Sequence, residues 1–268
     1  MDKKCAVILA AGEGTRMKSK KPKALAEVLF APMIDWVIGA AKESGIDDIC
    51  VVKGFGAEYL DAHLAGSCET VLQSERLGTG HAVLQAGNFI ESNGGDVLVL
   101  NGDAPFIDAK TIYDALALHK KEGNSVTVIS AEIDDPTGYG RIIRTENGIS
   151  GIVEHKDCTP MQLAITEINS GCYWFKTADL LEVLFDIKPE NAQGEYYLTD
   201  CIELLIAKGK KADAFISANP HVALGANDRR GLLALNDIAR YEIIGKWLDE
   251  GIEFCCTDGV SIGNNVTI

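Results

Sequence analysis

The stretch Lys4-Cys-Ala-Val-Ile-Leu-Ala-Ala-Gly-Glu-Gly-Thr-Arg16 opens the chain with an apolar run that passes directly into small residues and glycine. The run Lys4–Ala10 predicts a buried first strand, and the glycines predict a tight loop at its carboxyl end. A secretion signal is a poor alternative, because the apolar part is only about seven residues long and no small-residue cleavage site follows it. This opening is therefore typical of an α/β domain.

Strands and helices alternate through the first half of the 268-residue chain. Strands are predicted at Lys4–Ala10, Asp48–Lys53, Glu69–Leu72 and Asp96–Leu100, and helices at Pro32–Ser44, Ala57–Leu64, Gly80–Ile90 and Asp108–Glu122, with Asp108 as an N-cap. This alternation predicts a mainly parallel sheet with helices on both faces. Such sheets bind ligands at the carboxyl ends of their strands, here near Ala11, Gln73 and Asp103.

The pattern changes after a strand at Ser125–Glu132. The short extended segments that follow predict a mixed extension of the sheet over the mouth of the first half; they are Gly140–Arg144, Ile149–Glu154 and Ile168–Phe175. Helices are then predicted at Thr177–Phe185, Tyr197–Lys208 and Asp228–Asp249, with a strand at Ala212–Ser217.

The last nine residues, Val260–Ile268, contain one hexapeptide unit typical of a left-handed β-helix. One unit cannot bury its own apolar face, because repeat arrays need roughly three or more repeats. The residues alone leave two interpretations open, the start of a β-helix domain that has been cut off or a simple terminal strand.

Composition narrows the class of protein. The net charge of −14 argues against nucleic-acid binding, and no apolar run approaches the ~20 residues that span a bilayer. The eight cysteines contain no C-x-x-C pair, which argues against a zinc or redox site. Without a secretion signal, a reduced cytoplasmic chain is favoured. Five basic residues lie within eight positions, namely Arg16, Lys18, Lys20, Lys21 and Lys23. Such a cluster indicates either a focused anion-binding site or a solvated loop, and this basic segment taken alone favours the solvated loop.

The loop after the first strand carries the strongest chemical signal. Small residues at Leu9–Gly12 let backbone amides approach phosphate oxygens, Arg16 can bind them with two donors, and Lys23 adds a point charge. The loop matches neither the P-loop nor the dinucleotide fingerprint. A phosphate-binding loop of another class is indicated.

The segment Leu9–Met17, with Pro22-Lys23, resembles the opening of the sugar-1-phosphate nucleotidyltransferases. Over essentially its whole length, the chain more closely resembles the uridyltransferase domain of the bifunctional N-acetylglucosamine-1-phosphate uridyltransferase/glucosamine-1-phosphate acetyltransferase family. The closer resemblance is carried by Gln73–Ala82, Gly102-Asp103, Asp135–Ile142, Gly151–Asp157, Glu167–Asn169, Asn191–Asp200 and Gly225-x-Asn227.

The resemblance implies a role for each matching residue. The nucleotide-binding residues would be Leu9, Ala10, Ala11, Gly12, Lys23, Gln73, Gly78, Thr79, Asn101, Gly102 and Asp103. Arg16 and Lys23 would be catalytic, and Asp103 and Asn227 would bind Mg²⁺. The amino sugar would contact Gly140, Glu154, Asn169 and Asn227. Asn101 departs from the family, which often has tyrosine there. The departure matters little if only the backbone at this position contacts the ligand, and otherwise it bears on contacts to the base or ribose.

The resemblance also implies a Rossmann-like α/β nucleotidyltransferase fold with a mixed central sheet. Residues 1–227 would form the nucleotidyltransferase domain, 228–250 a long linker helix, and 251–268 the start of a truncated left-handed β-helix domain. The family's β-helix makes a homotrimer, so a chain without that surface is expected to be able to remain monomeric. No nucleic-acid or membrane partner is expected.

The implied reaction is Mg²⁺-dependent transfer of a uridylyl group from UTP to N-acetylglucosamine 1-phosphate. The attacking phosphate has a second pKa of about 6, so no general base is needed and His81 and His155 are interpreted as structural. One alternative is a related enzyme that uses dTTP or CTP and another acceptor. A second is a catalytically silent sensor, which is disfavoured because Arg16, Lys23, Asp103 and Asn227 are all present.

Overall fold

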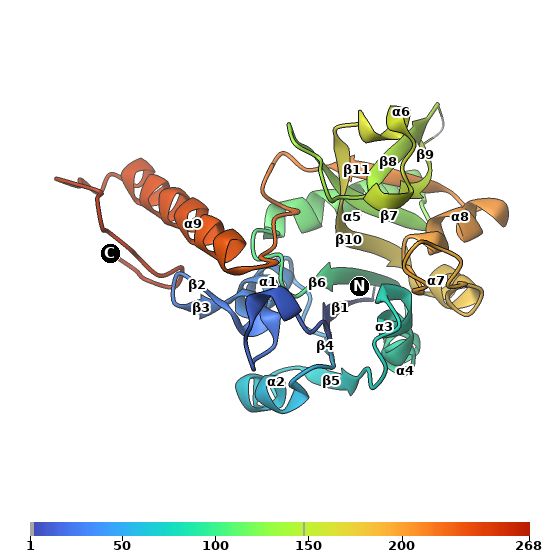
Figure 1. The fold of residues 1–268 in the computed structure, drawn as a ribbon, viewed down its shortest axis with the longest axis horizontal. Helices are drawn as coiled ribbons and strands as arrows, with labels where there is room; N and C mark the ends of the chain where they lie inside the picture. The colour runs from blue at the N-terminus through green and yellow to red at the C-terminus, as the bar shows by residue number, and fades with distance from the viewer. Residues whose placement is uncertain (1–2, 147) are drawn as a thin grey trace.

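The computed structural model describes residues 3–146 and 148–268, which form a nine-stranded sheet with helices on both faces (Figure 1). β1 (Lys4–Ala10) lies inside the sheet, between β6 (Asp96–Asn101) and β4 (Ile49–Lys53), and β5 (Glu69–Leu72) pairs with β4. All three pairings are parallel. The predicted parallel half of the sheet is confirmed.

The other half of the sheet is mixed, as predicted. β10 (Glu167–Lys176) is antiparallel to both β6 and β7 (Val126–Glu132), while β11 (Ala212–Ile216) is parallel to β7. β8 (Arg141–Thr145) and β9 (Gly148–Val153) form an antiparallel hairpin that joins β10 where Arg141 pairs with Ile168.

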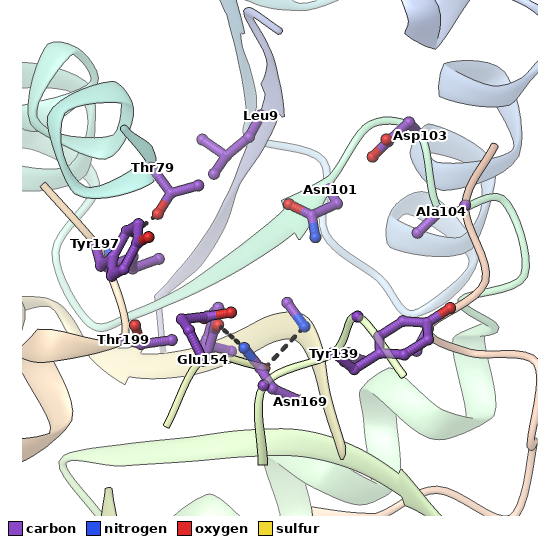
Figure 2. A pocket seen from close by; sticks show the side chains of 18 of the residues that line it. Leu9, Thr79, Asn101, Asp103, Ala104, Tyr139, Glu154, Asn169, Tyr197 and Thr199 are labelled. Carbon is purple, nitrogen blue, oxygen red and sulfur yellow. Dashed lines mark hydrogen bonds between the residues drawn. The ribbon is translucent and has the colours of Figure 1, made fainter. Parts of the chain in front are cut away.

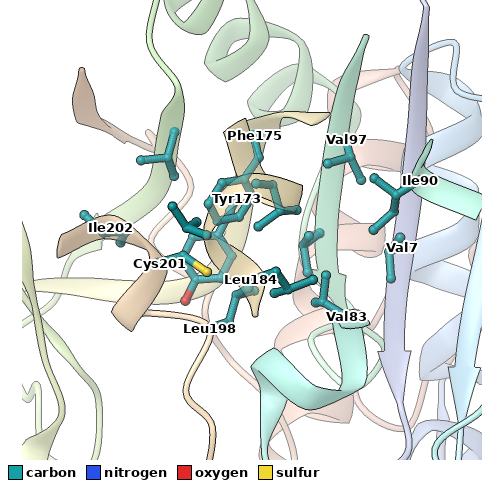
Figure 3. Close-up of a cluster of buried hydrophobic side chains, with 14 of the residues drawn as sticks. Val7, Val83, Ile90, Val97, Tyr173, Phe175, Leu184, Leu198, Cys201 and Ile202 are labelled. Carbon is teal, nitrogen blue, oxygen red and sulfur yellow. The ribbon is translucent and has the colours of Figure 1, made fainter. Parts of the chain in front are cut away.

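Alternate residues of β1 point into two separate cores, because successive side chains of a strand face opposite sides of a sheet. Val7 packs in a core covered by α3 (Thr79–Gln85), α4 (Gly87–Asn93), α7 (Thr177–Leu184) and α8 (Asp200–Ala207) (Figure 3). Ile8 packs in the opposite core, with α1 (Met33–Glu43), α2 (Ala57–Leu64) and α5 (Ala109–Glu122). The sheet is thus buried on both faces.

Two predicted helices differ from the structure. The single helix expected at Gly80–Ile90 is two helices, α3 and α4, which meet at Ala86. The helix expected to begin at Tyr197 begins at Asp200, and the Leu198 amide ahead of it donates to the Thr79 hydroxyl (3.0 Å). Several short elements were not predicted: β2 (Glu27–Val28), β3 (Ala31–Pro32), α6 (Pro160–Leu163), and the 3₁₀ turns Thr15–Met17, Lys23–Leu25 and His155–Asp157.

The long C-terminal helix is confirmed as α9 (Arg229–Asp249), which lies beside the β2–β3 hairpin (Figure 1). Asp228 caps it by accepting from the Gly231 amide at 2.8 Å. The described residues after Glu250 form neither helix nor strand, so the start of a β-helix stays a prediction. No helix in residues 3–146 and 148–268 is both long and apolar enough to cross a membrane.

Candidate active site

Two adjoining cavities lie at the carboxyl ends of β1 and β6. The first has a volume of about 480 Å³ and the second about 340 Å³. They share part of their lining, namely Leu9, Thr79, Asn101, Asp103 and Glu195. Ligands in the two cavities would therefore meet at the ends of these strands, where the sequence predicted a site.

The glycine loop and Lys23 form one wall of the second cavity. Leu9, Ala10, Ala11, Gly12 and Lys23 all line it. Gly14 has a positive φ of 60°, and a Cβ there would lie 2.9 Å from the Lys23 Cβ. Only glycine at this position leaves room for the lysine stem.

Lys23, Asp103 and Asn227 meet at the junction of the two cavities. The Lys23 ammonium makes an ion pair with the Asp103 carboxylate and donates to the Asn227 Oδ1 at 3.0 Å. Gly225 makes this approach possible, because a Cβ there would lie 2.9 Å from the Asp103 carbonyl oxygen. Residues 204 positions apart in the chain are thereby brought into direct contact.

The same cluster suits a hard divalent cation. One cation already reaches a carboxylate oxygen and an amide oxygen here, and Mg²⁺ prefers oxygen ligands of this kind. Within residues 3–146 and 148–268, no three His, Cys, Asp or Glu side chains form a metal-binding group. Mg²⁺ in proteins usually keeps substrate phosphate and water as further ligands beside one or two carboxylates.

Gln73 lines the second cavity, and its side chain is held in one orientation. The residue is 4% exposed, and its amide nitrogen donates to the Gly78 carbonyl (3.1 Å) and contacts the His81 Nδ1 (3.0 Å). The reversed amide would place two acceptor oxygens together, so the Gly78 carbonyl fixes the assignment. The carboxamide oxygen is therefore the atom that can accept a hydrogen bond from a ligand.

The loop Leu77–Gly80 is attached to a segment that the sequence analysis did not assign to the site. The Gly80 amide donates to the Tyr196 carbonyl and the Tyr196 amide donates to the Leu77 carbonyl, each at 2.8 Å. A Cβ at Gly78 would lie 2.6 Å from that Tyr196 oxygen. Glycine at position 78 is thus required by this chain contact. The neighbouring residues Glu195, Tyr197, Leu198 and Thr199 line the first cavity.

The first cavity holds the residues predicted to bind a sugar. Figure 2 shows Asp103 and Asn101 on one side of it, with Glu154, Asn169 and Tyr139 on the other. The Asn169 backbone amide donates to the Gly140 carbonyl at 2.9 Å, which brings two predicted residues together. Asn227 lines the same cavity. Carboxylate and carboxamide groups in this arrangement can bind hydroxyl groups.

Acidic side chains near the first cavity influence one another. Burial raises the pKa of the Glu154 carboxyl, and the charges of Asp157 and Asp200 raise it further. Burial also raises the pKa of Asp200 to about 6, with smaller contributions from Glu203 and Asp157. Of these residues, Glu154 lines the first cavity itself.

Two predicted residues do not line either cavity. Gly102 is buried, and its amide donates at 2.9 Å to the carbonyl of Leu9, which does line both cavities. Arg16 is exposed on the turn Thr15–Met17, outside both linings. The pKa of Asp228 is lowered chiefly by the Gly231 amide and, to a smaller extent, by the Arg16 charge. Arg16 therefore lies near the start of α9.

The two histidines near the site have partners within the protein. His81 contacts the amide nitrogens of Gln73 and Gln85, and His155 contacts an Arg141 guanidinium nitrogen at 3.5 Å. These contacts fit the structural interpretation of both residues. Glu13 and Arg76, which both line the second cavity, form an ion pair (3.1 Å) that was not predicted from the sequence.

Comparison with known proteins identifies relatives over most of the chain. Residues 5–252 match the family described as nucleotidyl transferase. The chain is 45% identical over 248 residues to the bifunctional protein GlmU of Pelotomaculum thermopropionicum, covering 92% of this chain and 54% of that protein. It is 45% identical over 271 residues to the bifunctional protein GlmU of Clostridium novyi, covering 99% and 58%. The chain thus spans about half the length of these curated relatives.

The fold is also similar to a solved structure. A protein described as a glucose-1-phosphate thymidylyltransferase from Bacillus anthracis, in complex with sucrose, matches with a TM-score of 0.73. The match covers 95% of this chain and 98% of that chain at 20% sequence identity. At this identity the match establishes the fold alone.

Proposed function

The chain belongs to the nucleotidyl transferase family, and from that membership we propose that it transfers a uridylyl group from UTP to N-acetylglucosamine 1-phosphate. One observation carries the proposal: Lys23, Asp103 and Asn227 meet where two cavities join. This junction suits a reaction between two phosphorylated substrates, because their negative charges must be offset where they meet.

In the proposed reaction, a phosphate oxygen of the sugar 1-phosphate attacks the α-phosphorus of UTP. A new P–O bond forms, the bond from the α-phosphorus to the bridging oxygen breaks, and that oxygen leaves with pyrophosphate. The nucleophile is largely deprotonated at neutral pH, since its second pKa is about 6. Lys23 would offset charge from within the second cavity, while the catalytic role of Arg16 rests on the sequence resemblance.

The second cavity would hold the nucleotide. Gln73 offers an acceptor oxygen, which suits the N3–H of uracil and disfavours cytosine, whose N3 is an acceptor. Around it we propose contacts from Leu9, Ala10, Ala11, Gly12, Gly78, Thr79 and Asn101, with Gly102 supporting them. Gly140, Glu154, Asn169 and Asn227 would bind the amino sugar in the first cavity.

Mg²⁺ is the proposed cofactor, held by the Asp103 carboxylate and the Asn227 amide oxygen. It would offset the charge of the nucleotide phosphates as a Lewis acid. We further propose a cytoplasmic enzyme whose residues 1–227 form the nucleotidyltransferase domain, with 228–250 as a linker helix and 251–268 beginning a β-helix.

The proposal is tested by measuring pyrophosphate release with Mg²⁺ and N-acetylglucosamine 1-phosphate while UTP, dTTP, CTP and GTP are compared. Release with UTP is expected, and it should be abolished by a chelator and by Asp103→Ala. Asp237→Ala, which removes an exposed carboxylate on α9, is the matched control and should retain full activity. Release only with another nucleotide would overturn the proposed substrate, and no release with any would overturn the proposed reaction.

A further inference from the structure

We infer that Lys23 is a built-in counter-cation: its ammonium group holds the position of the divalent cation between Asp103 and Asn227, and it transfers to nucleotide phosphate when metal and nucleotide bind. The inference rests on the proposed function, because it concerns the metal and nucleotide of that reaction. It adds a competition between a side chain and the metal for the same two oxygen atoms.

The Lys23 ammonium group contacts both residues that are proposed to bind the metal. The group pairs with the Asp103 Oδ2 and donates to the Asn227 Oδ1 at 3.0 Å, so it lies between the two oxygen donors proposed for the metal. A lysine ammonium is a compact charge with three donors, well suited to occupy a cation position. The Lys23 and Asp103 side chains are only 18% and 25% exposed, so solvent screens their attraction weakly.

The positive charge of the Lys23 ammonium opposes the binding of a dication at the same position. A dication bound to the same two oxygens would lie within a few ångströms of the ammonium, where like charges repel strongly in a partly buried site. The ammonium and the metal therefore exclude each other. A metal that arrives alone must displace Lys23 into water, whereas a metal that arrives with nucleotide offers the ammonium a phosphate in exchange.

The local structure allows the ammonium group to move without disturbing the fold. Ala24, the next residue, is 3% exposed and anchors the turn Lys23–Leu25. The lysine stem itself passes over Gly14, which has no side chain, and lines the second cavity. A change of side-chain rotamer is therefore enough to redirect the charge from Asp103 to a phosphate in that cavity.

The test is the affinity of the protein for Mn²⁺ alone, measured without nucleotide from the electron paramagnetic resonance signal of free Mn²⁺. Lys23→Met keeps the stem and removes the charge, so it should bind Mn²⁺ about tenfold or more tightly than the wild type. Lys21→Met is the matched control, because it removes a nearby exposed charge, and its Mn²⁺ affinity should stay at the wild-type value. Asp103→Asn in the Lys23→Met background should abolish the gain.

An unchanged or weaker Mn²⁺ affinity in Lys23→Met would overturn the inference, as would an equal gain in Lys21→Met, which would indicate a general charge effect. Far-ultraviolet circular dichroism checks that each variant is folded, and Lys23→Ala provides a second variant if Lys23→Met is not. A wild type that releases no pyrophosphate while Lys23→Met still gains Mn²⁺ affinity would refute the proposed function alone. An active wild type with no such gain would refute this inference alone.

Discussion

Asn169 lies in the first cavity with its carboxamide held by two neighbours. Its Nδ2 donates to the Tyr173 hydroxyl at 2.7 Å, and its Oδ1 accepts from the Gly171 amide at 2.9 Å. Tyr173 is 4% exposed, and burial raises the pKa of its phenol, so the hydroxyl stays protonated at neutral pH. Tyr173 therefore positions Asn169 without any charge of its own, and it leaves one amide hydrogen for a ligand.

Tyr173→Phe should raise the KM for N-acetylglucosamine 1-phosphate roughly fivefold, the effect of losing a net hydrogen bond of about 1 kcal/mol. The KM for UTP should not change, because Gln73 and the glycine loop are untouched. Steady-state kinetics with each substrate varied in turn provide the measurement. Tyr113→Phe, at a position 65% exposed on α5, is the matched control. An equal rise in both KM values would contradict a role specific to the sugar.

Several site residues could be predicted from their positions in the sequence, either at the ends of strands or within motifs of the family. Gln73 and Asp103 follow predicted strands, and the resemblance supplied Asn169 and Asn227. Tyr173 could not be found this way, because inside β10 it looks like an ordinary apolar strand residue. The contact between Lys23 and Asn227 could not be found either, since it depends on how the chain folds over 204 positions.

At the level of elements, the break between α3 and α4 shows what periodicity cannot detect. The helical apolar pattern continues across the break, because Ala82, Val83, Phe89 and Ile90 all face the same core. Gly87, which has low helix propensity, starts the second helix. The spacing of apolar residues predicts which helix face packs against the core. That spacing is the same for one continuous helix as for two helices that pack against the core one after the other.

The first turn of α8 should make stability depend on pH through Asp200. Its pKa is raised from 3.8 to about 6, chiefly by burial, so the native state keeps this proton to a higher pH than the unfolded state does. The contribution of this group to the free energy of unfolding therefore falls as pH rises from about 4 to about 6, and stays low above that. Asp200→Asn should remove this part of the pH dependence.

Urea unfolding at about pH 5 and about pH 7 measures the effect. The stability of Asp200→Asn relative to the wild type should increase with pH, because the asparagine cannot ionise in the buried position. Asp237→Asn on the exposed face of α9 is the control and should follow the wild type. A constant difference between Asp200→Asn and the wild type at both pH values would contradict the account.

At the scale of the whole molecule, the site depends on one departure from a parallel sheet. β10 is inserted antiparallel between β6 and β7, which places Asn169 and Tyr173 beside the end of β6 that leads to Asp103. The sequence predicts the parallel half from its repeated strand–helix units. It predicts that the second half is mixed, but the position of β10 follows from pairing between distant segments, which local patterns do not encode.

The proposed reaction joins a uridylyl group to an amino-sugar phosphate at the junction of the two cavities. The most direct test is the reverse reaction with UDP-N-acetylglucosamine, Mg²⁺ and radiolabelled pyrophosphate. Label is expected in UTP together with an equal amount of N-acetylglucosamine 1-phosphate, and Asp103→Ala should form neither. Folded wild-type protein that leaves all the label in pyrophosphate would contradict the claim.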